Sequence, residues 1–212
     1  MVDVSESARP RAQRLPAEER RRQIIEVAMR VFARAGYAQA GTAEIAAEAG
    51  ISEPTIYRHF ESKQALYLAT LDAGTTMILT EWRKIVDEAP DPLTAISRIS
   101  IWYEKKVGED PTLLQQRFRS LNASEEPAIR DAVRDAYLSV VELVRGVFER
   151  AIELGMLPKG LDPNVPTVLF LALGALSDVV EHLGMREDLG GESYASAGAT
   201  LLAMMGGKAL TE

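Results

Sequence analysis

A short polar cluster offers the most distinctive chemistry in this chain. Within five residues it holds two hydroxyls, a guanidinium and an imidazole, on Thr55, Tyr57, Arg58 and His59. Such groups hydrogen-bond to phosphate oxygens and to base edges, and the free N–H groups at a helix N-terminus add to this. An ordinary corner between two helices would expose a mixture of Glu and Lys instead. The crowding of these side chains therefore favours contact with nucleic acid.

Two short helices joined by a turn are predicted to present this cluster. Ile45 faces inward on the first helix, and a bulky side chain in place of Ala46 would hold the second helix away. Gly50 follows the first helix where a left-handed conformation makes a Cβ costly. Ser52 is a favourable N-cap for the second helix, and Pro54 falls in its first turn, where a missing N–H costs little. The pattern indicates a helix-turn-helix.

The flanking residues extend this pattern. Gly36-Tyr37 ends a preceding helix, and the helix-turn-helix unit closes with the residues Ile56-Tyr57-Arg58-His59-Phe60-Glu61-Ser62-Lys63-Gln64-Ala65-Leu66. Residues 18–68 resemble the DNA-binding domain of the tetracycline-repressor (TetR) family; beyond residue 70 the similarity is only one of size and helical pattern. The resemblance implies a dimer that binds palindromic operators and a larger C-terminal domain that binds a small molecule.

The resemblance also implies roles for individual positions. Four residues match the family's phosphate or backbone contacts: Thr42, Tyr57, His59 and Lys63. Four more occupy the base-facing edge of the recognition helix: Glu53, Pro54, Thr55 and Arg58. Family members usually carry Thr or Ser where this chain has Ala40 and Gly41. The usual side-chain N-cap is therefore absent, and backbone N–H groups remain to contact phosphate there.

The charge of the chain is divided unevenly along its length. The formal net charge is −7, yet residues 1–63 hold 10 Lys or Arg against 9 Asp or Glu, and residues 64–212 hold 14 against 22. Six arginines form a basic run near the N-terminus: Arg9, Arg11, Arg14, Arg20, Arg21 and Arg22. This segregation is compatible with local docking on DNA. The run could grip a groove or phosphates, or could simply be a solubilising tail.

Hydrophobic spacing predicts an all-α chain of about nine helices. A flexible basic arm over residues 1–15 precedes a three-helix DNA-binding domain over 16–62 and a regulatory domain for ligand binding and dimerisation over 63–212. A long helix over 62–89 should connect the two domains. Five further helices are expected, over 91–107, 111–122, 126–154, 164–183 and 192–205.

The last two predicted helices are apolar on nearly every side. Small residues permit close helix contact, and with their neighbours they form the predicted dimer interface: Gly174, Ala175, Ser177, Gly198, Leu201 and Leu202. A helix that is apolar all round must be buried all round. Two such helices from each of two chains would form an antiparallel four-helix interface. The alternative is a central helix buried within a monomer, but the resemblance favours the dimer.

The middle helices of the regulatory domain carry most of the aromatic side chains. A ligand pocket could be lined by Trp102, Tyr103, Leu114, Arg117, Phe118, Leu121, Tyr137, Val141 and Phe148. If Arg117 faces inward, the ligand should be mostly hydrophobic with a polar or anionic end. The alternatives are that the aromatics form ordinary core and that Arg117 is a surface or ion-paired residue.

Enzymatic chemistry finds little support in the composition. The chain has no Cys, which excludes disulfides, Cys-based zinc sites and cysteine nucleophiles. Its two histidines, His59 and His182, cannot assemble a catalytic triad or a zinc cluster. We therefore expect no catalytic residue, metal or cofactor. The longest apolar run, Val168 to Leu176, is far shorter than the ~20 residues that a membrane span needs, so no membrane partner and a cytoplasmic location are expected.

These features predict a dimeric, ligand-responsive transcription regulator of the TetR type, acting as a repressor in a bacterial cytoplasm and associated with the nucleoid when bound to DNA. Its expected partners are double-stranded operator DNA, a small-molecule effector and a second copy of the chain. Two other classes remain open: an effector-independent architectural DNA-binding protein, and a small-molecule-binding protein without operator binding.

Overall fold

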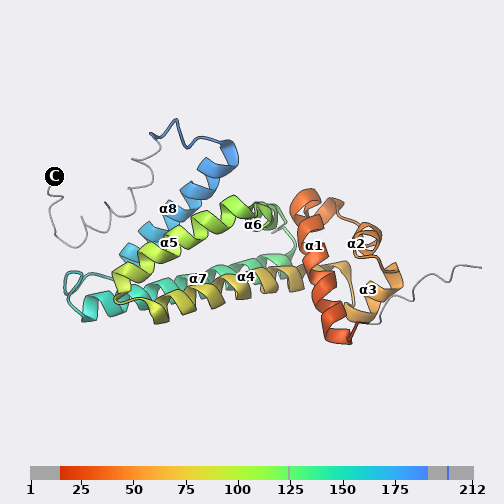
Figure 1. The fold of residues 1–212 in the computed structure, drawn as a ribbon, viewed down its shortest axis with the longest axis horizontal. Coiled ribbons are helices and arrows are strands. Elements are labelled where there is room, and N and C mark those ends of the chain that lie inside the picture. Colours follow the sequence, from red (N-terminus) through yellow and green to blue (C-terminus); the bar gives the residue numbers. More distant parts are fainter. Residues whose placement is uncertain (1–14, 124, 191–199, 201–212) are drawn as a thin grey trace, which may run out of the picture.

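In the computed structural model of this protein, the described residues are 15–123, 125–190 and 200, and they contain helices and no strands (Figure 1). The described helices are α1 (Ala17–Gln39), α2 (Thr42–Glu48), α3 (Glu53–His59), α4 (Lys63–Glu88), α5 (Pro92–Glu109), α6 (Thr112–Asn122), α7 (Pro127–Glu153) and α8 (Asn164–Leu183). The all-α prediction is confirmed. The helix predicted over 192–205 falls almost wholly outside the described residues.

Helices α1 to α3 form a compact head at one end of the molecule (Figure 1). Phe32 of α1, Ile45 of α2 and Ile56 of α3 are fully buried in one core. Gly50 has a φ of +67° at the turn between α2 and α3, as its position predicts. Gly36 has a φ of +79°, so α1 leaves helical geometry there before a last turn that ends at Gln39. The predicted helix-turn-helix is therefore present.

Helix α4 joins the head to the rest of the chain. The Ser62 side chain caps it by accepting a hydrogen bond from the Ala65 N–H at 3.0 Å. The helix then runs beside α7 along the length of the molecule (Figure 1) and continues through Gly74 without a break. A Cβ at Gly74 would lie 3.5 Å from Oε1 of Gln116 on α6. Gly74 thus permits α6 to approach α4 closely.

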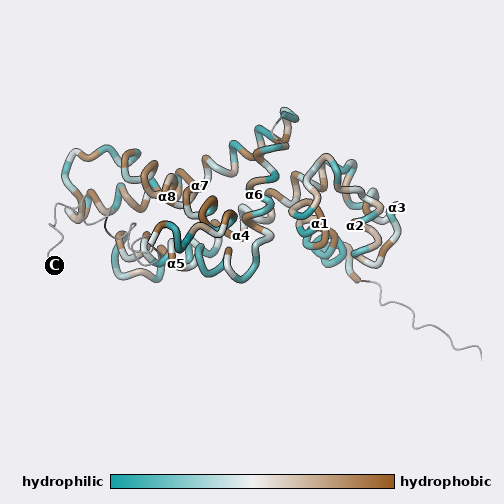
Figure 2. Tube along the Cα trace, turned by 90° about the horizontal axis from the view of Figure 1, so that it is seen from above, coloured by the Kyte–Doolittle hydropathy of each residue, from teal (hydrophilic) through white to brown (hydrophobic). Residues whose placement is uncertain are grey.

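Helix α8 is the most apolar helix of the regulatory domain (Figure 2). Six large side chains on it are exposed in the single chain: Val165, Val168, Leu169, Leu176, Val179 and Leu183. By length and composition alone, α8 could also cross a membrane, although core helices of soluble proteins pass the same test. The expectation that no segment is long enough was wrong, because it considered only the uninterrupted apolar run inside α8. Its Asp178 is buried in an ion pair with α6, which indicates packing against protein.

The phenol of Tyr67 provides a pH-dependent test of the head's packing. Its ring is fully buried, 4.8 Å from the Phe32 ring centroid and 4.9 Å from that of Tyr37. The hydroxyl has no hydrogen-bond partner among the described residues. Burial raises the pKa of Tyr67 to about 12. The folded chain therefore keeps a proton that the unfolded chain loses near pH 10.

We expect the free energy of unfolding to fall by up to about 2–3 kcal/mol as pH rises from about 10 to about 12. Denaturant titrations at a series of pH values would measure this slope. Tyr67→Phe should reduce it and should cost no stability at neutral pH, since the hydroxyl it removes makes no hydrogen bond. An equal slope in the variant and the original protein would contradict this assignment.

Candidate DNA-contact surface and ligand cavity

The exposed edge of α3 carries a connected set of polar side chains. Nη2 of Arg58 donates a hydrogen bond to Oγ1 of Thr55 at 3.1 Å, and Oγ of Ser52 lies 2.9 Å from the same oxygen. Ser52 occupies the N-cap position, as predicted, but its side chain does not cap the backbone. The Ser52 hydroxyl is instead hydrogen-bonded to the Thr55 hydroxyl. Pro54 and Arg58 are exposed on this edge, and Glu53 is half-buried.

Thr42 joins the start of α2 to α3. Its side chain is almost buried, and its hydroxyl donates to the Glu53 carboxylate. The same oxygen lies 3.1 Å from the hydroxyl of Tyr57, whose side chain is 48% exposed. The Thr42 hydroxyl therefore positions two of the predicted DNA contacts. Direct contact of Thr42 with the DNA backbone stays a prediction.

Two basic side chains near the junction of α3 and α4, Lys63 and His59, differ in their surroundings. Nζ of Lys63 donates to the carbonyl oxygen of Ala38 at 3.3 Å and lies 4.9 Å from the centroid of the Tyr37 ring. Partial burial lowers the pKa of Lys63. His59 lies in the last turn of α3 and is half-buried. Lys63 would have to exchange its contact with Ala38 for a phosphate, so its role also stays a prediction.

Only part of the basic run is described. Arg9, Arg11 and Arg14 lie outside the described residues. The Arg21 guanidinium lies 4.7 Å from the centroid of the Phe60 ring, where it packs on the head. On the other side of α1, Arg34 pairs with Glu44 and Glu48 of α2 at 2.7 and 3.2 Å. These pairs hold α2 in place against α1.

Gly41 occupies the N-cap position of α2 without a side-chain cap, as the sequence predicts. Its φ of −100° and ψ of 141° suit any residue, and no atom would lie within 4 Å of an added Cβ. We expect Gly41→Ser to stabilise the fold by a few tenths of a kcal/mol, because Ser caps α2 better than Gly. The added hydroxyl could also reach phosphate and raise operator affinity by up to about tenfold.

Denaturant midpoints and operator titrations would measure both effects of Gly41→Ser. The matched control is Gly41→Ala, which adds a Cβ but neither a cap nor a phosphate donor. Equal behaviour of the two variants would show that the position contributes nothing through a hydroxyl.

A cavity of about 660 Å³ lies among α4 to α8. Four of the nine predicted ligand residues line it: Tyr103, Arg117, Tyr137 and Phe148. The other five do not line it: Trp102, Leu114, Phe118, Leu121 and Val141. Phe118 instead packs its ring 5.1 Å from that of His182, and Leu121 is exposed near the end of α6. Ligand contact by any of the nine stays a prediction.

Two walls of the cavity come from helices outside the predicted ligand set. Helix α4 contributes Leu71, Gly74, Thr75, Ile78 and Trp82, and α8 contributes Phe170, Leu171 and Leu173 among others. The α4 positions recur at intervals of three and four residues, so they share one face of that helix. This spacing is visible in the sequence, although the helix over 62–89 is predicted there only to connect the two domains.

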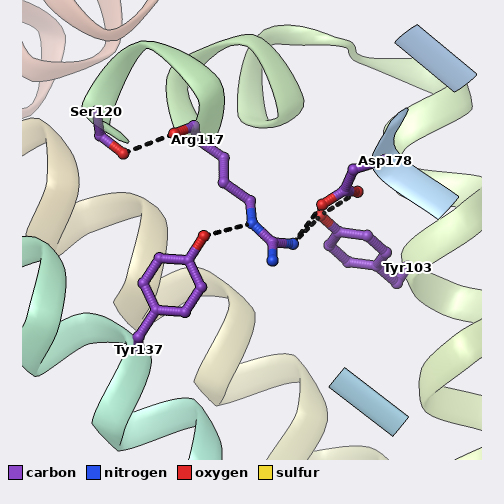
Figure 3. Close-up of polar contacts among 5 residues, drawn as sticks. All are labelled: Tyr103, Arg117, Ser120, Tyr137 and Asp178. Atoms are coloured by element: carbon purple, nitrogen blue, oxygen red, sulfur yellow. Dashed lines mark hydrogen bonds and ion pairs between the residues drawn. The ribbon is translucent and has the colours of Figure 1, made fainter. Parts of the chain in front are cut away.

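A polar cluster lines part of the cavity and joins four helices (Figure 3). The Arg117 guanidinium of α6 donates to the Tyr137 hydroxyl of α7 at 2.8 Å and to the Tyr103 hydroxyl of α5 at 3.2 Å. It also pairs with Asp178 of α8, which accepts a hydrogen bond from Tyr103 at 2.9 Å. Of the two expectations for Arg117, an inward-facing cation and an ion-paired residue, the structure shows both.

Burial shapes the ionisation of this cluster. It raises the pKa of the Tyr103 phenol, and the neighbouring Asp178 carboxylate raises it further. Burial also raises the pKa of Asp178, which is 3% exposed, while Arg117 and the Tyr103 hydrogen bond oppose this rise. Burial alone would lower the pKa of Arg117. The electrostatic attraction of Tyr103, Asp178 and Tyr137 outweighs this effect, so the pKa of Arg117 is raised. The Tyr103 phenol is therefore a neutral donor and acceptor at physiological pH.

Three of the six predicted dimer residues lie on α8. Gly174, Ala175 and Ser177 line the cavity, so these small residues contribute to its wall. The exposed apolar stripe lies on other positions of α8, among them Leu169, Leu176 and Val179. Gly198, Leu201 and Leu202 lie outside the described residues. Among the described interface candidates, Gly174 and Ser177 are half-buried and Ala175 is exposed, so their place in a dimer interface stays a prediction.

The helices of the head match a known protein family. Residues 24–70, which span α1 to the first turns of α4, match the family model for bacterial regulatory proteins of the tetR family. The head is a DNA-binding domain of the TetR type. The matched segment holds every predicted DNA contact, so the TetR family match and the polar edge of α3 fall on the same residues.

Relatives within the TetR family agree with this assignment. The transcriptional activator FasR of Mycolicibacterium smegmatis is 42% identical over 81 residues, which is 38% of this chain and 37% of FasR. The chain thus matches only about a third of that relative's length. The regulator AcrR of Shigella flexneri is 28% identical over 171 residues, 78% of this chain and 79% of AcrR. Both are named as transcriptional regulators and not as enzymes.

A solved structure resembles nearly the whole fold of this chain. The regulator FadR from Bacillus subtilis, in complex with stearoyl-CoA, superposes with a TM-score of 0.72 over 89% of this chain and 98% of FadR. The two sequences are 16% identical, so the comparison shows the fold alone. The chain therefore shares its fold with FadR beyond the head as well as within it.

Proposed function

We propose that this TetR-family regulator is a dimeric repressor in the bacterial cytoplasm that binds a palindromic operator and is released from it by a small, mostly hydrophobic effector. The cavity of about 660 Å³ is the observation that carries the effector proposal. Its volume is in the range of sites for small molecules, and its lining is mainly aliphatic and aromatic. The effector would therefore be largely apolar.

Helix α4 supports a mechanical link between cavity and DNA. One face of α4 lines the cavity from Leu71 to Trp82. Its first residue, Lys63, follows the last residue of α3, His59, after three intervening residues. A ligand that favours one position of α4 would therefore move the recognition helix. In a dimer this would change the separation of the two recognition helices.

Helix α6 supports a second link. Four of its residues line the cavity: Leu113, Gln116, Arg117 and Ser120. On its other side it packs along α1, where Nη2 of Arg119 donates to the carbonyl oxygen of Arg34 at 3.3 Å. The Arg119 side chain also lies 3.5 Å from where a Cβ at Gly36 would be. Displacement of α6 by a ligand would be passed directly to α1 of the head.

The apolar stripe on α8 supports the dimer. The single chain leaves Leu169, Leu176 and Leu183 exposed to water by 37%, 47% and 62%. Exposed apolar surface of this extent on one helix marks an interaction site, and a second copy can bury it symmetrically. A two-fold dimer would place its recognition helices on half-sites spaced by about one helical turn of DNA, ~34–36 Å, or a multiple of it.

The relatives support an effector and leave the sign of regulation to experiment. FadR was solved with stearoyl-CoA, whose acyl chain is apolar. FasR is named as an activator. We propose repression for this chain, because effector binding that disturbs the fit of two recognition helices removes the protein from DNA.

The proposal is tested in two steps with the full chain. Genome-wide mapping of bound DNA would identify the operator, and the neighbouring genes would suggest effector candidates. Each candidate would then be tested for thermal stabilisation of the free protein and for its effect on operator affinity. A ligand that lowers operator affinity tenfold must itself bind the operator complex tenfold more weakly, a coupling of about 1.4 kcal/mol.

The outcomes separate the three classes of function. A ligand that stabilises the protein and reduces operator affinity supports the proposal. Specific operator binding that no stabilising ligand affects would indicate an architectural DNA-binding protein. Ligand binding without binding to any genomic site would indicate a small-molecule-binding protein.

A further inference from the structure

The cavity contains one cationic side chain and several neutral polar groups. Among its described lining residues, Arg117 is the only Lys or Arg, and Glu104 is the only Asp or Glu. An anionic effector would therefore depend on Arg117 to balance its charge. Whether Arg117 already has an anionic partner within the protein therefore decides whether the cavity favours anionic effectors.

The positive charge of Arg117 is already balanced within the protein. Its Nη1 pairs with the Asp178 carboxylate, which is 3% exposed and does not line the cavity. Its Nε donates to the Tyr137 hydroxyl at 2.8 Å. Its Nη2 makes no hydrogen bond to a described residue, and Figure 3 shows no contact at this nitrogen. Arg117 can thus offer the two N–H donors of Nη2 to a ligand without offering a net charge.

A carboxylate in the cavity would lose its hydration without gaining an unpaired cation. To pair with Arg117 it would have to compete with Asp178, and separating a buried ion pair is costly. Glu104 would add repulsion. Burying a neutral oxygen costs less free energy than burying a carboxylate, because a hydrogen bond within the protein compensates for the lost hydration. Gln116 also lines the cavity, and because its Nε2 donates to Thr70, its Oε1 is the candidate acceptor for a ligand hydroxyl.

We propose that the cavity selects uncharged effectors, which are mostly apolar molecules that end in a hydroxyl, carbonyl, ester or amide group, and that Asp178 excludes free carboxylates by neutralising Arg117. The inference rests on the proposed effector function of the cavity. It replaces the anionic ligand end that Arg117 alone would predict. Asp178 is thus a specificity-determining residue that acts through Arg117.

The test compares three ligands that share one alkyl chain: decanol, decanoate and decyltrimethylammonium. Calorimetric titration of the full chain, without DNA, measures their affinities. Decanol should bind at least about tenfold more tightly than either charged compound. Decanoate or the ammonium ion binding as tightly as decanol would overturn the proposal by itself, whatever happens with the variants.

Variants then test the role of Asp178. Asp178→Asn keeps the shape of the side chain and leaves the charge of Arg117 unbalanced, so the affinity ratio should move toward decanoate by at least about tenfold. The matched control is Asp135→Asn on the exposed side of α7, which makes the same change in net charge and should leave the ratio unchanged. An unchanged ratio in a folded Asp178→Asn would overturn the role of Asp178.

A double variant addresses the risk that an unpaired Arg117 unfolds the chain. Arg117→Gln combined with Asp178→Asn removes both charges and leaves no lone buried ion. It should keep the preference for decanol, and a preference for decanoate in this variant would contradict the proposed charge balance.

Operator release is measured separately, so that the two proposals can fail separately. Decanol that binds but leaves the operator complex intact would contradict the regulatory function and leave the head-group preference standing. Decanoate that binds best and releases the operator would overturn the preference and support the regulatory function. Binding by none of the three compounds would overturn the preference together with the cavity's role as effector site.

Discussion

Leu176→Glu should convert the dimer into monomers and abolish specific operator binding. Leu176 lies within the apolar stripe of α8 and is 47% exposed in the single chain. A carboxylate there would be buried against the apolar stripe of the second copy without a partner, at a cost that a dimer interface does not tolerate. Each half-site alone binds weakly. Operator affinity should therefore fall toward the nonspecific level, by on the order of 10³-fold or more.

Analytical ultracentrifugation and operator titration would measure the two effects of Leu176→Glu together. Leu154→Glu is the matched control, because Leu154 is 51% exposed just after α7 and lies off the α8 stripe. The head should stay folded in both variants, which its helical content would show. Sedimentation of the unmodified protein as a monomer at micromolar concentration would refute the dimer, and dimeric Leu176→Glu would place the interface elsewhere.

Arg58→Ala should weaken operator binding by about 1–3 kcal/mol and relax the preference at one base pair. The Arg58 side chain is exposed on α3, and its hydrogen bond to Thr55 orients the guanidinium along the edge that is predicted to face DNA. An arginine that pairs with a base edge contributes to one position of the site. An arginine that contacts only phosphate contributes equally to all sequences.

Selection of bound sequences from a randomised operator would distinguish these two roles of Arg58. Arg58→Lys is the informative control, since it keeps the charge and loses the planar guanidinium that forms two parallel hydrogen bonds. If Arg58 contacts a base, the lysine variant should lose the same base preference but retain more affinity than the alanine variant. An unchanged sequence preference in Arg58→Ala would remove Arg58 from the base-contacting set.

The head could be predicted from sequence because its signals are local. Gly50, Ser52 and Pro54 each specify a backbone feature within a few residues, and the structure has the turn and the helix start at those positions. The side-chain hydrogen bonds were not predictable in the same way. The contact between Thr42 and Tyr57 joins residues on different helices, so it depends on how α2 and α3 cross.

The cavity was predicted less well because it is formed by long-range packing. Tyr103 and Arg117 were identified from residue type, but their partner Asp178 lies 75 and 61 residues away in the sequence. The two faces of α8 also could not be separated from composition, since the helix is apolar in both directions. Only the packing of α8 against its neighbours shows that Gly174 and Ser177 face the cavity and that Leu176 faces outward.

Helix α6 depends on its surroundings to remain folded. It has 11 residues and no side-chain cap from its N-cap residue, Pro111, and an isolated helix of this length is marginal in water. Packing on α1 supports one side, and the contents of the cavity support the other. An empty cavity therefore leaves α6 freer to open locally, and a bound effector removes that freedom. The effector would thus act on α1 through the conformational entropy of α6 as well as through its position.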